Sequence, residues 1–213
     1  MSDAADPHGP YETLRHQEET TIAGMWLFLA SESLLFGGLF LVSLIYAHTR
    51  ANGWAAGVRH TDLVIGGVNT VILITSSAIY TLAVEAARQD HKRRAVQAAM
   101  TAAALGLVFL LLKAFEWSKE FKEHLFPGTH FAITGADAGG AQLFYSFYFL
   151  ATFLHAVHMI VGTGLIAWIC LRAGKVNPGK SWNTSVEIVG LYWSFVDLVW
   201  MILFPVLYLV GRT

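Results

Sequence analysis

Apolar residues gather in five long runs that are separated by short polar segments. The runs cover approximately residues 22–47, 63–86, 95–117, 143–171 and 186–210. Each is long enough to cross the hydrocarbon core of a bilayer, which takes roughly 20 helical residues. Lipid offers the backbone no hydrogen-bond partner, and the runs are continuous rather than alternating, so helices are favoured over barrel strands. The pattern predicts an all-α polytopic membrane protein, a bundle of five transmembrane helices.

The sequence predicts a single domain that follows a short N-terminal segment. We predict an N-terminal segment over residues 1–21 and a five-helix transmembrane domain over residues 22–213. The first run differs from a cleaved signal peptide because it is too long and lacks a basic segment before it. The longest connection covers about residues 118–142 and carries Pro127 and a glycine-rich piece. We expect it to be an ordered surface loop.

Composition narrows the classes of function. Hydrophobic residues make up 55% of the 213 residues and charged residues only 14%, whereas soluble domains carry about 25% charged residues. The net charge of −1 argues against a nucleic-acid partner, which needs a concentrated basic face. Cys170 is the single cysteine, which excludes an internal disulfide and a cysteine-ligated zinc or iron–sulfur site.

Lysine and arginine are divided unequally between the two ends of the predicted bundle. One end receives eight of them, four within residues 88–94, and the other end receives five. Cytoplasmic loops of membrane proteins are enriched in these two residues. The distribution therefore predicts a cytoplasmic N-terminus and a C-terminus on the outside.

Six ionisable residues lie inside the predicted spans, where a charged group costs roughly 2.5–3.5 kcal/mol to insert. They are Glu32, Lys113, Glu116, His155, His158 and Asp197. Glu32 lies near the middle of its span. We leave open whether it handles protons or contacts lipid, or instead fixes helix packing as a protonated acid. Asp197 is expected to hydrogen-bond to a donor on an adjacent helix.

Two pairs of these residues are three positions apart and so share a helical face. Lys113 and Glu116 are expected to form an ion pair that anchors the end of its span at the headgroups. His155 and His158 could ligate a metal or a haem, or hydrogen-bond to Glu32 or Glu116. A structural pair is favoured, because the chain lacks the Glu-x-x-His motifs of di-iron bundles and both histidines lie on one helix.

Four further residues are expected at helix contacts: Trp26, Trp193, Trp200 and Gly162. Aromatic rings supply a large contact area between helices, and glycines allow helices to approach closely in a membrane. The sequence shows no nucleophile–base pair, no redox ligand set and no nucleotide-binding loop. We therefore predict no catalytic residue and no metal ligand, and a supporting membrane subunit rather than an independent catalyst.

Four segments resemble subunit III of the haem-copper respiratory oxidases, in the order of that family and in its short five-helix form. They are WLFLASE (Trp26–Glu32), LLLKAFEW (Leu110–Trp117), ATFLHAVHMIVG (Ala151–Gly162) and YWSFVDLVW (Tyr192–Trp200). Glu32 matches the family glutamate that reacts with hydrophobic carbodiimides, and Glu116 matches the glutamate of its K-x-x-E element. His155 and His158 match the His-x-x-His pair, and Asp197 matches the aspartate that follows the aromatic stretch.

The resemblance implies a non-catalytic subunit that binds no haem or copper and packs mainly on subunit I, which holds both. It further implies contacts with subunit II and a small subunit IV, bound phospholipid, and a role in sustained proton uptake. The complex would reduce O2 to water with electrons from cytochrome c. Its location would be a bacterial inner membrane, with the C-terminus of this chain in the periplasm.

Several alternatives stay open at this point. Within the resemblance they are subunit III of a quinol oxidase and the related protein associated with nitric oxide reductases. Outside it they are a proton-coupled membrane transporter and a haem-binding electron carrier. The chain shows neither the inverted repeat nor the paired broken helices that are typical of transporters, which favours the oxidase subunit.

Overall fold

The computed structural model describes residues 14–129, 131–173 and 180–212. All regular secondary structure in the described residues is helical, and these residues contain no strand. Its helices are α1 (Leu14–Thr49), α2 (Ala51–His60), α3 (Leu63–Arg88), α4 (Lys92–Lys122), α5 (Ala138–Ala173) and α6 (Lys180–Tyr208). Five of them, all except α2, are long and apolar enough to cross a membrane. The prediction of an all-α bundle with five spans is confirmed.

The boundaries differ from the predicted ones in two places. Helix α1 begins at Leu14, inside the predicted N-terminal segment, and residues 1–13 of that segment lie outside the described residues. The short helix α2 follows α1 directly and was not anticipated between the first two spans. It forms because Trp54 and Val58 lie one turn apart and are both buried. In the connection after α4, the Phe126 ring stacks on Phe121 of α4.

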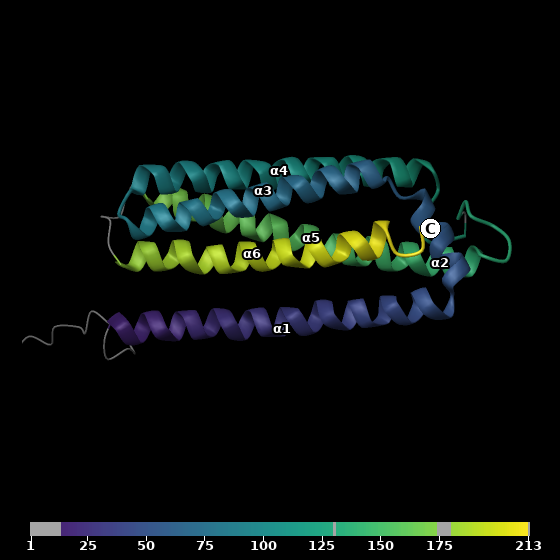
Figure 1. The fold of residues 1–213 in the computed structure, drawn as a ribbon, viewed down its shortest axis with the longest axis horizontal. Helices are drawn as coiled ribbons and strands as arrows, with labels where there is room; N and C mark the ends of the chain where they lie inside the picture. The colour runs from purple at the N-terminus through teal and green to yellow at the C-terminus, as the bar shows by residue number, and fades with distance from the viewer. Residues whose placement is uncertain (1–13, 130, 174–179, 213) are drawn as a thin grey trace, which may run out of the picture.

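Four long helices form one group and α1 lies along its side (Figure 1). Helices α3 and α4 run side by side and make the most extensive contact, and α6 packs between α3 and α5. In the described chain α1 touches only α2, α5 and α6. Its outward face is therefore a stripe of exposed apolar side chains, which includes Trp26, Leu27, Leu34, Leu41 and Leu44.

Helix α2 lies across the end of α5 at very close range. A Cβ atom added to Gly53 would come within 2.5 Å of the Gly140 Cα atom, so only glycine allows this approach. Trp54 packs edge-on against Phe144, with ring centroids 5.0 Å apart. The contact closes this end of the bundle, where the C-terminus of the described chain also lies (Figure 1).

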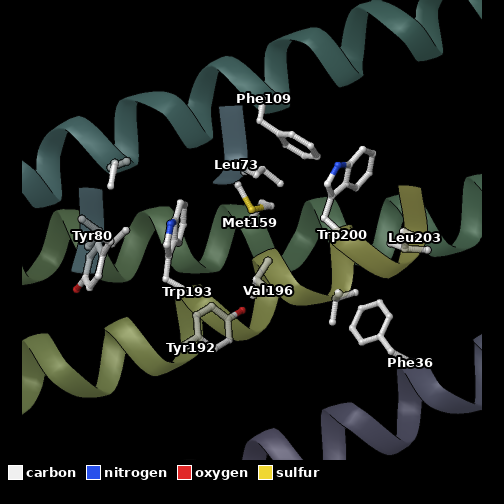
Figure 2. Close-up of a cluster of buried hydrophobic side chains, with 14 of the residues drawn as sticks. Phe36, Leu73, Tyr80, Phe109, Met159, Tyr192, Trp193, Val196, Trp200 and Leu203 are labelled. Carbon is white, nitrogen blue, oxygen red and sulfur yellow. The ribbon is translucent and has the colours of Figure 1, made fainter. Parts of the chain in front are cut away.

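The core is built around Trp193 and Trp200, which project from α6 toward α4 (Figure 2). Both rings are fully buried. Trp193 is held between two glycines. A Cβ atom added to Gly106 of α4 would lie 2.6 Å from the Trp193 ring, and one added to Gly162 of α5 would lie 2.9 Å from it. Trp26, expected at a helix contact, is instead 58% exposed. It lies on the face of α1 that turns away from the other helices.

Asp62 is the N-cap residue of helix α3 and also forms an ion pair with Lys119. The Asp62 Oδ1 atom accepts hydrogen bonds from the backbone N–H groups of Val64 and Ile65, and Oδ2 lies 3.1 Å from the Lys119 Nζ atom. Burial alone would raise the pKa of Asp62. The hydrogen bond and positive charge of Lys119, together with the hydrogen bond from the Ile65 backbone N–H, outweigh burial and lower the pKa below its usual range.

This arrangement predicts a pH-dependent contribution to stability. A lowered pKa in the folded state means that charged Asp62 stabilises the fold at neutral pH, and that this stabilisation is lost as the pH falls through the lowered pKa. The stability difference between the wild type and Asp62→Asn, measured by thermal unfolding in detergent, should therefore shrink between neutral pH and about pH 3. Asp137→Asn, in an exposed loop, is the control. A difference that does not change with pH would contradict the prediction.

Candidate functional site

A buried ionic cluster joins α4, α5 and α6. The Lys113 Nζ atom donates to the Glu116 carboxylate at 3.0 Å, to the Tyr148 hydroxyl at 2.7 Å and to the Tyr208 hydroxyl at 2.9 Å. Tyr208 in turn donates to the other oxygen of Glu116 at 2.7 Å. All three protons of the ammonium group therefore have acceptors, which is what a charge removed from water requires.

The ion pair of Lys113 and Glu116 exists, but its position differs from the prediction. The side chains are only 2% and 1% exposed, so they do not reach toward the headgroups. Tyr148 of α5 and Tyr208 of α6 cover the ammonium group, which also lies 4.3 Å from the centre of the Tyr148 ring. The pair ties three helices together from inside the bundle rather than anchoring one helix at the surface.

A second carboxyl group lies one turn further along α4. Glu120 is 4% exposed, and neither of its oxygens makes a hydrogen bond to another described residue. The hydroxyl of Tyr145 is buried on α5 and is likewise without a partner in the described chain. The cluster thus contains two buried carboxyl groups and one lysine. Glu120 lay beyond the predicted end of its span, although its spacing of four from Glu116 places it on the same helical face.

Glu32 and His158 form the second polar contact of interest. The His158 Nε2 atom lies 3.1 Å from the Glu32 carboxyl group, and Nδ1 lies 2.7 Å from the backbone carbonyl oxygen of Leu154. A carbonyl oxygen can only accept, so Nδ1 must donate. A single proton then lies between Nε2 and the carboxyl group, whichever of the two groups carries it. This contact connects α1 to α5 inside the membrane.

His155 does not share the environment of His158. It is 1% exposed, and neither of its ring nitrogens has a hydrogen-bond partner among the described residues. Its ring packs between aromatic side chains of α4 and α6, with centroid distances of 5.5 Å to Phe109 and 5.2 Å to Trp200. The expectation of a hydrogen-bonded structural pair therefore describes His158 only, because the helix turns His155 toward an apolar neighbourhood.

Asp197 also departs from its expected contact. It is 4% exposed, and its two oxygens make no hydrogen bond within the described chain. The Ser77 side chain of α3 lies close to the carboxyl group, but the geometry does not form a bond. Two neighbouring tryptophans of α6 do form polar contacts with α3. Trp193 donates to Ser76 and Trp200 donates to Thr70, each at 3.1 Å.

Within the described part of the chain, the histidine and acidic side chains are not grouped as metal ligands. The described residues contain no group of three or more histidine, cysteine or acidic side chains that could hold a metal. Both ring nitrogens of His158 are already engaged. His155 is enclosed by Phe109 and Trp200, and its ring nitrogens contact no other polar group of the described residues. What the arrangement can do is hold helices together and keep protons at two places, the partly buried Glu32–His158 contact and the buried Lys113 cluster.

Comparison with known proteins gives one consistent family. The family described as cytochrome c oxidase subunit III matches residues 12–212 of this chain. Cytochrome c oxidase subunit 3 of Thermostichus vulcanus is 30% identical, with 90% of this chain and 88% of that protein covered. Cytochrome bo(3) ubiquinol oxidase subunit 3 of Pseudomonas aeruginosa is also 30% identical, with 99% and 95% covered.

A third relative has a different length. Heme-copper oxidase subunit I+III of Aeropyrum pernix is 31% identical over 197 residues, which cover 88% of this chain. The chain spans only 22% of that longer protein. Its name shows that subunits I and III are joined there in one polypeptide.

Proposed function

Because the chain belongs to the family of cytochrome c oxidase subunit III, we propose that it is the non-catalytic subunit of a terminal oxidase that reduces O2 to water. In this proposal the haem and copper lie in the partner catalytic subunit. This chain contributes assembly, lipid binding and sustained proton uptake. The observation that carries the proposal is the family match across residues 12–212, which includes all five spans.

We propose subunit I as its main partner. The archaeal relative in which subunits I and III form one polypeptide supports this, since fused segments are held at high effective concentration. The exposed apolar stripe of α1, with Leu27 and Leu34, is available to a partner or to lipid. Contacts with subunit II and a small subunit IV follow from the family resemblance alone.

Cytochrome c is the proposed electron donor, and quinol is the second candidate. Relatives of similar identity carry both names: cytochrome c oxidase subunit 3 and quinol oxidase subunit 3. Mass spectrometry of the intact, mildly solubilised complex would identify the neighbouring subunits. A subunit II with a copper-binding motif would support cytochrome c, and a subunit II without one would support quinol.

The proposed location is a bacterial inner membrane. The excess of lysine and arginine around residues 88–94 supports a cytoplasmic end at the α3–α4 turn, with the N-terminus on the same side. The Lys113 cluster then lies toward the periplasm, and so do α2 and the C-terminus. Labelling of an engineered cysteine after Arg212 in intact cells would test this orientation.

The supporting role is tested by variants of two residues inside the spans, Glu32 and His155. We expect Glu32→Gln and His155→Ala to leave the haem and copper content of the purified complex intact, and to impair assembly or shorten the period of sustained turnover. Glu123→Gln, an exposed glutamate beyond α4, is the matched control and should behave as wild type. Loss of haem or copper in either variant, with assembly otherwise normal, would contradict the proposal. So would a haem absorption band from this polypeptide alone.

A further inference from the structure

The second buried carboxyl group of α4, that of Glu120, is left without a cation by the packing of the bundle. Glu120 is 4% exposed, and neither of its oxygens has a hydrogen-bond partner among the described residues. It lies in the last turn of α4 and still within the apolar span. A carboxyl group in such a place must either find a cation or keep its proton, because an unpaired charge in an apolar interior costs far more than a neutral acid.

The cation whose charge acts on Glu120 is Lys113, and its hydrogen bonds are already used. The Nζ atom donates to Glu116, to Tyr148 and to Tyr208, so an ammonium group with three protons has none left for Glu120. Glu116, in contrast, accepts from Lys113 at 3.0 Å and from Tyr208 at 2.7 Å. These two bonds identify Glu116 as the ionised partner of the lysine.

The other charged side chains of α4 near Glu120 do not supply a counter-ion. Lys119 precedes it in the chain but lies 3.1 Å from Asp62, and both side chains of that pair are partly exposed. Glu116 and Glu123 add negative charge at Glu120 and so oppose its ionisation. The Lys113 cluster therefore holds one cation against two buried carboxyl groups.

Helices α5 and α6 present tyrosine hydroxyl groups to this carboxyl group rather than cations. Tyr148 lies close to Glu120, but the geometry does not form a hydrogen bond. The Tyr145 hydroxyl is buried beside it and has no partner in the described chain. Tyr208 of α6 donates its proton to Glu116. No group on these two helices therefore replaces the missing cation.

We propose that Glu120 is a proton-binding site, at which the Lys113 cluster holds one exchangeable proton while Glu116 stays ionised. The cluster then carries no net charge. Glu120 lies two residues before the exposed end of α4 at Lys122, so the proton has a short way to water at the end of the bundle that α2 closes (Figure 1). The site goes beyond the proposed function, because the contacts of the cluster alone carry it, and it shares no residue with the Glu32–His158 contact.

Infrared difference spectroscopy of the oxidase complex tests the charge state, because a protonated carboxyl group has a carbonyl band that a carboxylate lacks. At neutral pH the difference between wild type and Glu120→Gln should contain this band, and the band should shift in D2O as the proton exchanges. The difference between wild type and Glu123→Gln, an exposed glutamate one turn further on, should show carboxylate bands only. A Glu120→Gln difference without the protonated band, or with a band that does not shift in D2O, would overturn the proposal.

A stability measurement decides which of the two glutamates carries the proton. Glutamine has the shape of a neutral glutamic acid, so Glu120→Gln should leave the midpoint of unfolding by dodecyl sulfate unchanged at neutral pH. Glu116→Gln should lower the midpoint, because Lys113 loses its ionised partner. The opposite order, or equal effects of the two variants, would contradict the assignment of the proton to Glu120.

Two further measurements separate the remaining outcomes. Replacing potassium by sodium ions at constant pH should leave the protonated band in place; its loss would show that the site binds a metal cation instead, and the proposal would fail. Copurified subunit I is measured on the same samples. Its absence from the wild-type preparation would contradict the proposed function, whereas a missing band with subunit I in place would contradict only the proton site.

Discussion

Replacing Lys113 by methionine is expected to lower the free energy of unfolding of the chain by about 3–5 kcal/mol, the usual cost of removing one partner from a buried ion pair. The variant leaves the Glu116 carboxylate buried without its cation, and Glu120 has no hydrogen-bond partner of its own among the described residues. Tyr148 and Tyr208 lose the ammonium group that joins their hydroxyls. Unfolding by increasing amounts of dodecyl sulfate, followed by circular dichroism, measures the effect.

The exposed ion pair of the same helix provides the matched control. Lys119 lies 3.1 Å from Asp62, with side chains 48% and 29% exposed. Exposed pairs contribute about 0–1 kcal/mol, so Lys119→Met should change stability little. The double variant Lys113→Met/Glu116→Gln should recover part of the loss, because the uncompensated charge is gone. Equal effects of the two lysine variants would show that the Lys113 cluster does not stabilise the bundle.

Replacing Gly162 by valine is the second change with a large expected effect, a loss of about 1–3 kcal/mol. The added Cβ would come within 2.9 Å of the Trp193 ring. The ring has little room to move away, because α4 lies close to it at Gly106. A Cβ atom added to Gly106 would lie 2.6 Å from the ring. A shift would also break the hydrogen bond from Trp193 to Ser76.

Gly164→Val is the control for this prediction, since it lies two residues away on the same helix and has nothing within 4 Å of an added Cβ. It should be close to neutral in the same dodecyl sulfate titration. Adding Trp193→Phe, which has a smaller ring, should restore part of the stability lost in Gly162→Val. Such a recovery would not be expected if valine destabilised the helix by itself. Equal destabilisation by the two glycine variants would contradict the clamped position of Trp193.

The polar contacts show how far sequence reasoning reaches. The spacing of Lys113 and Glu116 was enough to predict their ion pair, because residues three apart are neighbours on any helix. It was not enough to place the pair inside the bundle, since the covering hydroxyls come from Tyr148 and Tyr208, 35 and 95 residues away. For His158 the sequence offered Glu32 or Glu116 as partners, and the packing of α1 on α5 selects Glu32.

The amino-acid sequence by itself determined the number of spans and their helical character, because hydrocarbon thickness sets the length of a spanning segment and an unpaired backbone is not tolerated in lipid. It also determined the family, through four short segments within these spans. Only the tertiary structure decided which side of each helix turns inward. In a membrane both sides are apolar, so hydrophobicity does not distinguish a buried Trp193 from an exposed Trp26. Close packing of side chains makes that distinction, and it depends on helices that are distant in the sequence.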